Sequence, residues 1–245
     1  MASPPLALKI SLGLLMLDSL IETAFVSSMV RWLHTRAGRD FLFTSSNSTH
    51  PLHGKPLNLL IDQGHTSNGA AGTAFVLISL GGILSLKLRH HATSHPHNTR
   101  SSTSTFSKII HTTWLIFTFL SMLLSLGALI YTFTLTSSHT DQHIDTTLAA
   151  SLNNQPYPNQ VPYPKDSWTP ENWFKAVLEI PLVSKSDRDT INFHLRIMQA
   201  WRWNLIPMFI LGLAVFVCAT IDAVAQWKKD RQVRSFMREG KRLSV

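Results

Sequence analysis

The chain has 245 residues, of which 44% are hydrophobic, and its formal charge is +8. That charge alone would fit a nucleic-acid-binding protein, but seven basic residues form a tail directly after an apolar segment. Such a tail faces the anionic cytoplasmic leaflet of a membrane, so nucleic-acid binding is not expected. The single cysteine, Cys218, excludes an intramolecular disulfide.

Four apolar segments are long enough to cross a bilayer, which takes about 20 residues. They cover about residues 6–30, 69–88, 109–135 and 203–224. Each should be a continuous helix, because lipid offers no partner for free backbone groups. We therefore predict an all-α membrane protein, a four-helix transmembrane bundle that forms a single domain over residues 1–245.

The first segment has an alternative interpretation as a secretory signal peptide, because Lys9 precedes an apolar stretch that leads to small residues. Asp18 and Glu22 interrupt that stretch, and apolar residues continue beyond them as far as Val26. This continuation favours a membrane span.

Asp18 and Glu22 are four residues apart and share one helix face. An ionised carboxylate near the bilayer centre costs roughly 2.5–3.5 kcal/mol, so both should face the bundle interior, paired or protonated. They have two alternative roles. They could hold helices together through hydrogen bonds, or they could act as catalytic or transport residues, as intramembrane ionisable groups often do.

The loop over residues 31–68 contains Asn47-Ser48-Thr49, the only N-glycosylation sequon in the chain. The loop over residues 89–108 is short, basic and rich in Ser, Thr and His, and four histidines fall within eight residues: His90, His91, His95 and His97. Such a tract could bind a metal or respond to pH, or it could be a solvated linker.

The loop over residues 136–202 is the largest polar segment. His139, Asp141, His143 and Asp145 would form two pairs on a helix, but no further ligand cluster is evident, so neither a metal site nor a cofactor is predicted. A Pro-rich extended stretch follows over residues 157–164.

A helix should then begin with Thr169 as its N-cap and Pro170 in its first position. Its apolar stripe, together with Trp168, predicts a short amphipathic helix at the membrane surface. Trp168, Trp173 and Phe174 are therefore candidates for a partner-contact surface, unless this helix only caps the bundle.

A last helix should begin near Ser186 or Asp187 and lead into the fourth span. Arg202 and Asn204 lie at the start of that span, and Glu22 lies ~13 Å inside the first span at 1.5 Å per residue. We predict that Arg202 or Asn204 supplies an ion pair or a hydrogen bond to Glu22. The alternative is that Arg202 extends to the lipid headgroups and Glu22 stays protonated.

The charge distribution predicts the orientation. The N-terminus, the loop 89–108 and the tail 225–245, counted with Lys9 and Lys87 at the adjoining span ends, carry twelve Lys or Arg and two acids. Loops 31–68 and 136–202 together carry ten Lys or Arg and nine acids. The more basic side should be cytoplasmic, with both termini on it. The expected location is the plasma membrane or an endomembrane, with Asn47 on the opposite, glycosylated side.

The four-span layout with a larger second outer loop resembles that of tetraspanins, and more loosely that of claudin-like proteins, although these outer loops lack the cysteine motifs of both groups. The stretches Trp168–Trp173 and Trp203–Pro207 resemble a set of uncharacterised fungal four-span membrane proteins. That resemblance implies a fungal origin and no particular activity.

The absence of a phosphate-binding loop, a nucleophile constellation or a complete metal set favours a scaffold or partner-binding protein that sits in the lipid bilayer and binds a protein partner through its outer loop. The alternative is a membrane-embedded enzyme, a cyclase or isomerase of a lipophilic substrate, with Asp18 and Glu22 as an acid–base pair. A transporter ranks third, because no internal repeat is evident.

Overall fold

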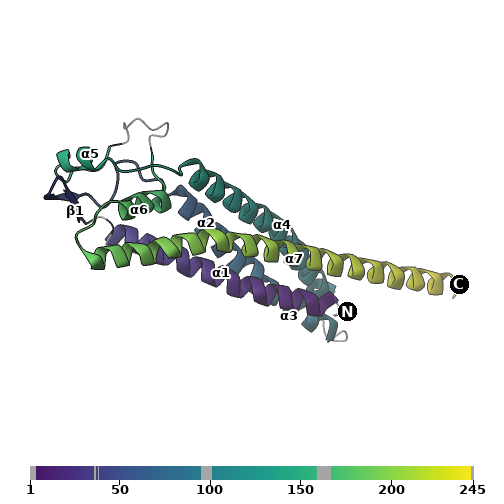
Figure 1. Cartoon of the computed structure of the whole chain (residues 1–245). Helices are drawn as coiled ribbons and strands as arrows, with labels where there is room; N and C mark the ends of the chain where they lie inside the picture. The colour runs from purple at the N-terminus through teal and green to yellow at the C-terminus, as the bar shows by residue number, and fades with distance from the viewer. Residues whose placement is uncertain (1–3, 36, 38, 95–100, 159–166, 244–245) are drawn as a thin grey trace. The chain divides into compact units, whose positions relative to one another are not determined.

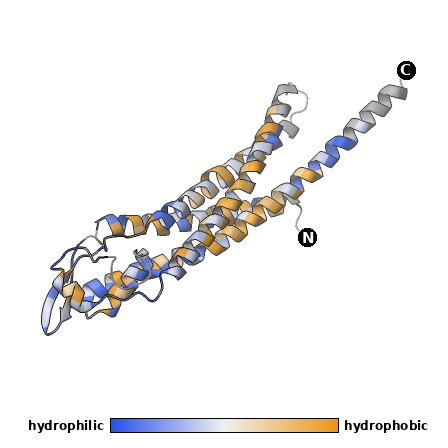
Figure 2. Cartoon of the chain, turned by 90° about the horizontal axis from the view of Figure 1, so that it is seen from above, coloured by the Kyte–Doolittle hydropathy of each residue, from blue (hydrophilic) through white to orange (hydrophobic). Residues whose placement is uncertain are grey.

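The computed structural model describes residues 4–35, 37, 39–94, 101–158 and 167–243. Over these residues, four helices are long and apolar enough to cross a membrane. They contain the four segments predicted from the sequence, and Figure 2 shows that their central stretches are mainly hydrophobic. The length and composition of these helices are compatible with an integral membrane protein.

The long helices extend beyond the predicted spans (Figure 1). The first is α1 (Pro4–Thr35) and the third is α4 (Ser101–Ser138). The fourth, α7 (Lys185–Leu243), begins one residue before the predicted start and continues through Pro207. In Figure 2, α7 becomes hydrophilic after its apolar stretch, where Lys228, Lys229 and Arg231 begin the basic tail.

The second helical stretch consists of α2 (Asp62–Thr73), the π-helix η1 (Ala74–Leu80) and α3 (Gly81–Ser94). In η1 the Ser79 hydroxyl donates to the carbonyl of Ala74, five residues earlier, at 2.9 Å. The indole nitrogen of Trp114 on α4 donates to the Ile78 carbonyl at 3.0 Å. A π-helical turn widens the backbone spacing, and here one of its carbonyls accepts a side chain from another helix.

The described chain divides into two compact units. The terminal unit comprises Met1–Leu17, Thr73–Leu123 and Met208–Val245, and the loop unit comprises Asp18–Gly72 and Leu124–Pro207. Each unit contains segments of several long helices, and these segments pack against one another within the unit. In the terminal unit, a Cβ added to Gly82 would lie 2.7 Å from the Trp114 ring and 3.0 Å from Leu12, which shows how closely these three residues pack.

A β-hairpin in the loop unit corrects the all-α prediction. Strands β1 (Phe41–Ser45) and β2 (Ser48–Leu52) pair antiparallel, and the turn residues Ser46 and Asn47 both have positive φ. Residues 181–183 pair with the other edge of β1, because Phe43 lies opposite Leu182. Alternating burial along β1 sends Phe41 and Phe43 inward, as expected for strands with one buried face.

Two short helices complete the loop unit. Helix α5 (Thr146–Ser151) starts at Asp145, whose carboxylate accepts two backbone N–H groups. Helix α6 (Pro170–Glu179) has Thr169 as its N-cap, with the hydroxyl accepting the Asn172 N–H at 3.3 Å, and Pro170 in its first turn. The predicted start of this helix is confirmed. The predicted Pro-rich stretch falls largely on residues 159–166, outside the described residues.

The loop unit has its own hydrophobic core, to which both long loops contribute. Trp168, Trp173 and Phe174 are almost completely buried in it, beside residues of the hairpin and Met198 of α7. Helix α6 is amphipathic, as predicted, with Lys175 and Glu179 exposed on its polar face. Its apolar face packs against the core of the loop unit, so protein residues cover the face that we expected to meet the membrane surface. These loops form a packed module without a disulfide, since the chain has one cysteine.

Candidate functional site

Glu22 lies on α1 within the loop unit, and its side chain is completely buried. Its Oε2 atom accepts a hydrogen bond of 3.1 Å from the side-chain amide of Asn204 on α7. The indole of Trp201, one helical turn earlier on α7, also lies within interaction range of this carboxyl group. The predicted contact between Glu22 and Asn204 is therefore confirmed.

Asp18 lies one turn from Glu22 on the same face of α1, and its side chain is buried. The two carboxyl groups are close enough to interact electrostatically. Asp18 Oδ2 and Glu22 Oε1 are both buried and have no hydrogen-bond partner among the described residues. The pair can therefore accept two further hydrogen bonds, or share or exchange protons with a ligand.

Arg202 does not contact Glu22 as one alternative predicted. Its guanidinium pairs with the Glu171 carboxylate of α6 at 3.1 Å and lies 5.4 Å from the centre of the Phe133 ring. Burial raises the pKa of Glu171, and the charge of Arg202 opposes that shift. Arginine side chains near a span end extend outward, and here an acid on the loop helix lies on that side. Arg202 thus connects α7 to α6.

The other predicted site residues lie apart from the acid pair. Asn47 is exposed in the hairpin turn, where a glycan would have space. Trp168, Trp173 and Phe174 belong to the loop-unit core and offer no exposed contact surface. Their rings pack against one another and against Tyr157, with Trp168 and Trp173 centroids 5.1 Å apart.

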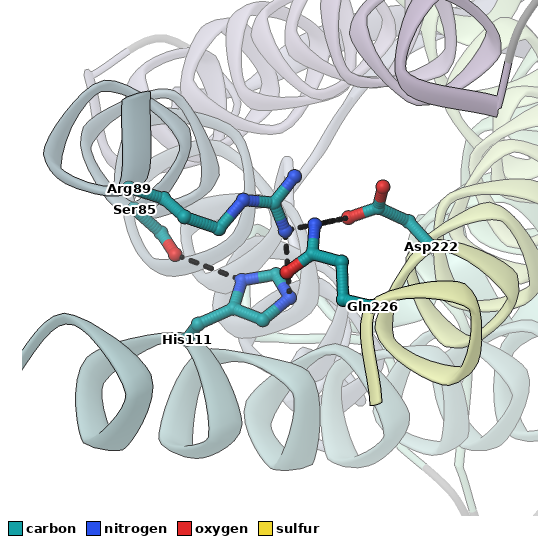
Figure 3. A network of polar contacts seen from close by, with 5 residues as sticks. All are labelled: Ser85, Arg89, His111, Asp222 and Gln226. Carbon is teal, nitrogen blue, oxygen red and sulfur yellow. Dashed lines mark hydrogen bonds and ion pairs between the residues drawn. The ribbon is translucent and has the colours of Figure 1, made fainter. Parts of the chain in front are cut away.

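A second polar cluster lies in the terminal unit, where Figure 3 shows five side chains from three helices. Arg89 of α3 forms an ion pair of 2.6 Å with Asp222 of α7, and Gln226, one turn along α7, donates to the same carboxylate at 3.2 Å. Arg89 also lies 3.4 Å from His111 of α4, whose other ring nitrogen is 3.1 Å from the Ser85 hydroxyl. Only 7% of the Asp222 side chain is exposed.

Sequence reasoning missed this second cluster. In the sequence, Arg89 is one of several basic residues of the loop 89–108, and His111 and Asp222 are single polar residues inside apolar segments. The signal available was the pair Asp222 and Gln226, which share a helix face inside an apolar segment. A buried charge inside a span requires a partner, so a search for a basic residue at the same depth would have led to Arg89.

The metal hypotheses find no support in the described residues, where no group of three or more His, Cys, Asp or Glu could hold a metal ion. Residues 139–145 are not helical, and Asp141 has a φ of 63°, so the expected ligand pairs do not form. His143 pairs with Glu179 at 2.7 Å instead, and His139 contacts Ser167 at 3.0 Å. His95 and His97 lie outside the described residues.

An apolar cavity of about 40 Å³ lies in the loop unit between Met29, Met198 and Trp201. Two open grooves lie in the terminal unit, one beside Arg89 and Lys108 and one between α1 and α3. None of these three is lined by Asp18 or Glu22.

Comparisons of the chain with protein families, curated proteins and solved structures give no match. The resemblance to fungal four-span proteins therefore stays a prediction.

Proposed function

We propose that the protein is a scaffold or partner-binding component of a cellular membrane, with its termini on the cytoplasmic side and its loop unit on the other. The observation that carries this proposal is the loop unit itself. Two long loops build a common hydrophobic core, and Arg202–Glu171 and Asn204–Glu22 connect it to the helices. A rigid module supported on membrane helices is suited to present a binding surface.

The contact surface that we propose differs from the one the sequence predicted. Leu42 on β1 and Val183 in the segment 181–183 lie opposite each other, because Val183 N–H donates to the Leu42 carbonyl at 2.9 Å. Both are about half exposed, at 47% and 53%, and Pro181 extends the same exposed face. Apolar side chains that gather on the surface of a polar loop module are typical of protein-contact sites. The occupant proposed here is a protein partner.

A photo-cross-linking experiment tests this proposal. A photoreactive phenylalanine analogue at position 42 or 183 should give the same discrete cross-linked protein in cells. The matched control is position 57, whose leucine is 65% exposed in the same unit but lies outside the sheet face. The paired substitution Leu42→Ser with Val183→Ser, combined with a probe at Thr44, should abolish the product. Equal products at position 57, or none at 42 and 183, would refute the proposal.

The second candidate is a membrane-embedded enzyme that acts on a lipophilic substrate. One buried carboxyl oxygen on Asp18 and one on Glu22 have no hydrogen-bond partner within the described part of the chain, and this favours the enzyme. The variant Asp18→Asn with Glu22→Gln separates the candidates. A scaffold should keep both the cross-linked product and the cellular lipid composition. An enzyme would keep the cross-link and accumulate a lipid substrate detectable by mass spectrometry.

A further inference from the structure

A groove in the terminal unit runs between α1 and α3. Its volume is about 710 Å³, and it is open to the surroundings along one side. The lining residues are Lys9, Leu12 and Gly13 of α1 with Ile83, Leu86, Lys87, His90 and His91 of α3. Both helices belong to the membrane-spanning set, so the groove lies where lipid can reach it.

The floor of the groove is apolar. On α1, Leu12 and Gly13 come three and four residues after Lys9, and on α3, Leu86 and Lys87 come three and four residues after Ile83. Residues at this spacing share one face of a helix, so each helix lines the groove with a single face. A Cβ added to Gly13 would meet nothing within 4 Å, which shows that the groove has open space at this glycine.

The rim of the groove is basic. Lys9, Lys87, His90 and His91 line it, and none of the described lining residues is acidic. The neighbouring groove of the same unit provides a contrast, because there Lys108 pairs with Asp230 at 2.6 Å and both residues line the wall. The charge of the α1–α3 groove is therefore not balanced by acids within its own lining.

We propose that this groove binds an anionic glycerophospholipid. One acyl chain would lie along Leu12, Gly13, Ile83 and Leu86, and the phosphate would lie between Lys9 and Lys87. The change from apolar floor to basic rim takes one helical turn, which matches the boundary between acyl chains and headgroups. Basic pockets between membrane helices bind anionic headgroups by this combination of charge and apolar contact. This site is independent of the loop unit and of the proposed partner.

Native mass spectrometry of the full-length protein tests the proposal. The detergent-solubilised protein is titrated with phosphatidylserine and phosphatidylcholine of identical acyl chains. The wild-type protein should prefer phosphatidylserine. Each lysine near the surface contributes about a fivefold factor, so Lys9→Gln with Lys87→Gln should reduce the preference about 25-fold. Lys9→Arg with Lys87→Arg should retain the preference, because arginine keeps the positive charge at both positions.

Two further variants separate the groove from general basic attraction. Lys228→Gln with Lys229→Gln removes the same charge from exposed positions of α7 and should leave the preference unchanged. Gly13→Leu keeps every charge, occupies the floor and should weaken binding of both lipids several-fold. The proposal is overturned if the tail variant loses as much preference as the groove variant, if Gly13→Leu binds normally, or if water-soluble glycerophosphoserine competes as well as the full lipid.

Discussion

Replacing Gly54 with alanine is expected to unfold the loop unit. Gly54 is buried after β2, and a Cβ at this position would lie 2.0 Å from the Ala37 carbonyl oxygen and 2.3 Å from that of Arg39. Both are backbone atoms, which cannot move aside as a side chain can. The carbonyl of Gly54 also accepts the Trp173 indole N–H at 2.9 Å, so a shift of this segment would break a hydrogen bond in the core.

The expected loss in the free energy of unfolding is about 4 kcal/mol or more, at the upper end of the range for single substitutions. Thermal unfolding of the detergent-solubilised protein, followed by tryptophan fluorescence, measures it, because Trp168 and Trp173 lie in the affected core. Gly69→Ala in α2 is the matched control. A Cβ there meets nothing within 4 Å, and alanine favours the helix by about 1 kcal/mol. Equal stability of the two variants would contradict this account of Gly54.

Replacing Asp222 with alanine is expected to destabilise the terminal unit by about 3 kcal/mol, the cost of leaving a buried charge without its partner. Arg89 is only 20% exposed, and its ion pair with Asp222 is the shortest contact of the cluster in Figure 3. Loss of the carboxylate also removes the acceptor of the Gln226 amide.

The same helices supply a matched control. Lys108 and Asp230 form an ion pair of equal length, 2.6 Å, but their side chains are 58% and 45% exposed. Asp230→Ala should cost at most about 1 kcal/mol, as for other exposed pairs. Arg89→Leu combined with Asp222→Leu should recover much of the lost stability, since both members of the buried ion pair are then removed together. Thermal unfolding of all three variants tests the reasoning, which fails if Asp222→Ala and Asp230→Ala lose equal stability.

Local chemistry allowed the helices and several of their ends to be predicted from the sequence. Long apolar segments give spanning helices whatever their neighbours are, and Thr169-Pro170 sets the start of α6 through one hydroxyl and one fixed φ angle. The contact between Glu22 and Asn204 was also predictable, because a carboxyl group inside an apolar helix requires a polar partner at similar depth.

Contacts between distant parts of the chain could not be predicted in this way. Arg202 pairs with Glu171 and not with Glu22, because the fold of the second loop brings α6 close to Arg202. Arg89 and Asp222 are 133 residues apart, and no local pattern joins them. The sequence suggests that the tryptophans of the second loop are exposed. They are buried because residues of the first loop and of α7, which are distant in the sequence, cover them.

The hairpin was missed for a related reason. Its turn contains Ser46 and Asn47, without the glycine that commonly marks a tight turn, and its strands are only five residues long. Their apolar face becomes recognisable as buried only when α6 and residues 181–183 are packed against it.

We propose that the chain crosses the membrane four times, with the loop unit on one side and the tail on the other. Both the proposed partner site and the proposed lipid site depend on this topology. Accessibility of single cysteines to a membrane-impermeant maleimide measures this directly, in a Cys218→Ser background that removes the only native thiol. Thr44→Cys and Lys185→Cys report the two long loops, and Ser235→Cys reports the tail; all three positions are exposed.

Cells are permeabilised in two steps, so that the maleimide first passes the plasma membrane after digitonin and then passes all membranes after detergent. We predict that the cysteines at positions 44 and 185 react together in one step and that the cysteine at position 235 reacts in another. Asn47→Gln should at the same time remove a glycan-dependent shift in mobility. If the cysteines at positions 44 and 235 become reactive in the same step, the four-span arrangement is wrong.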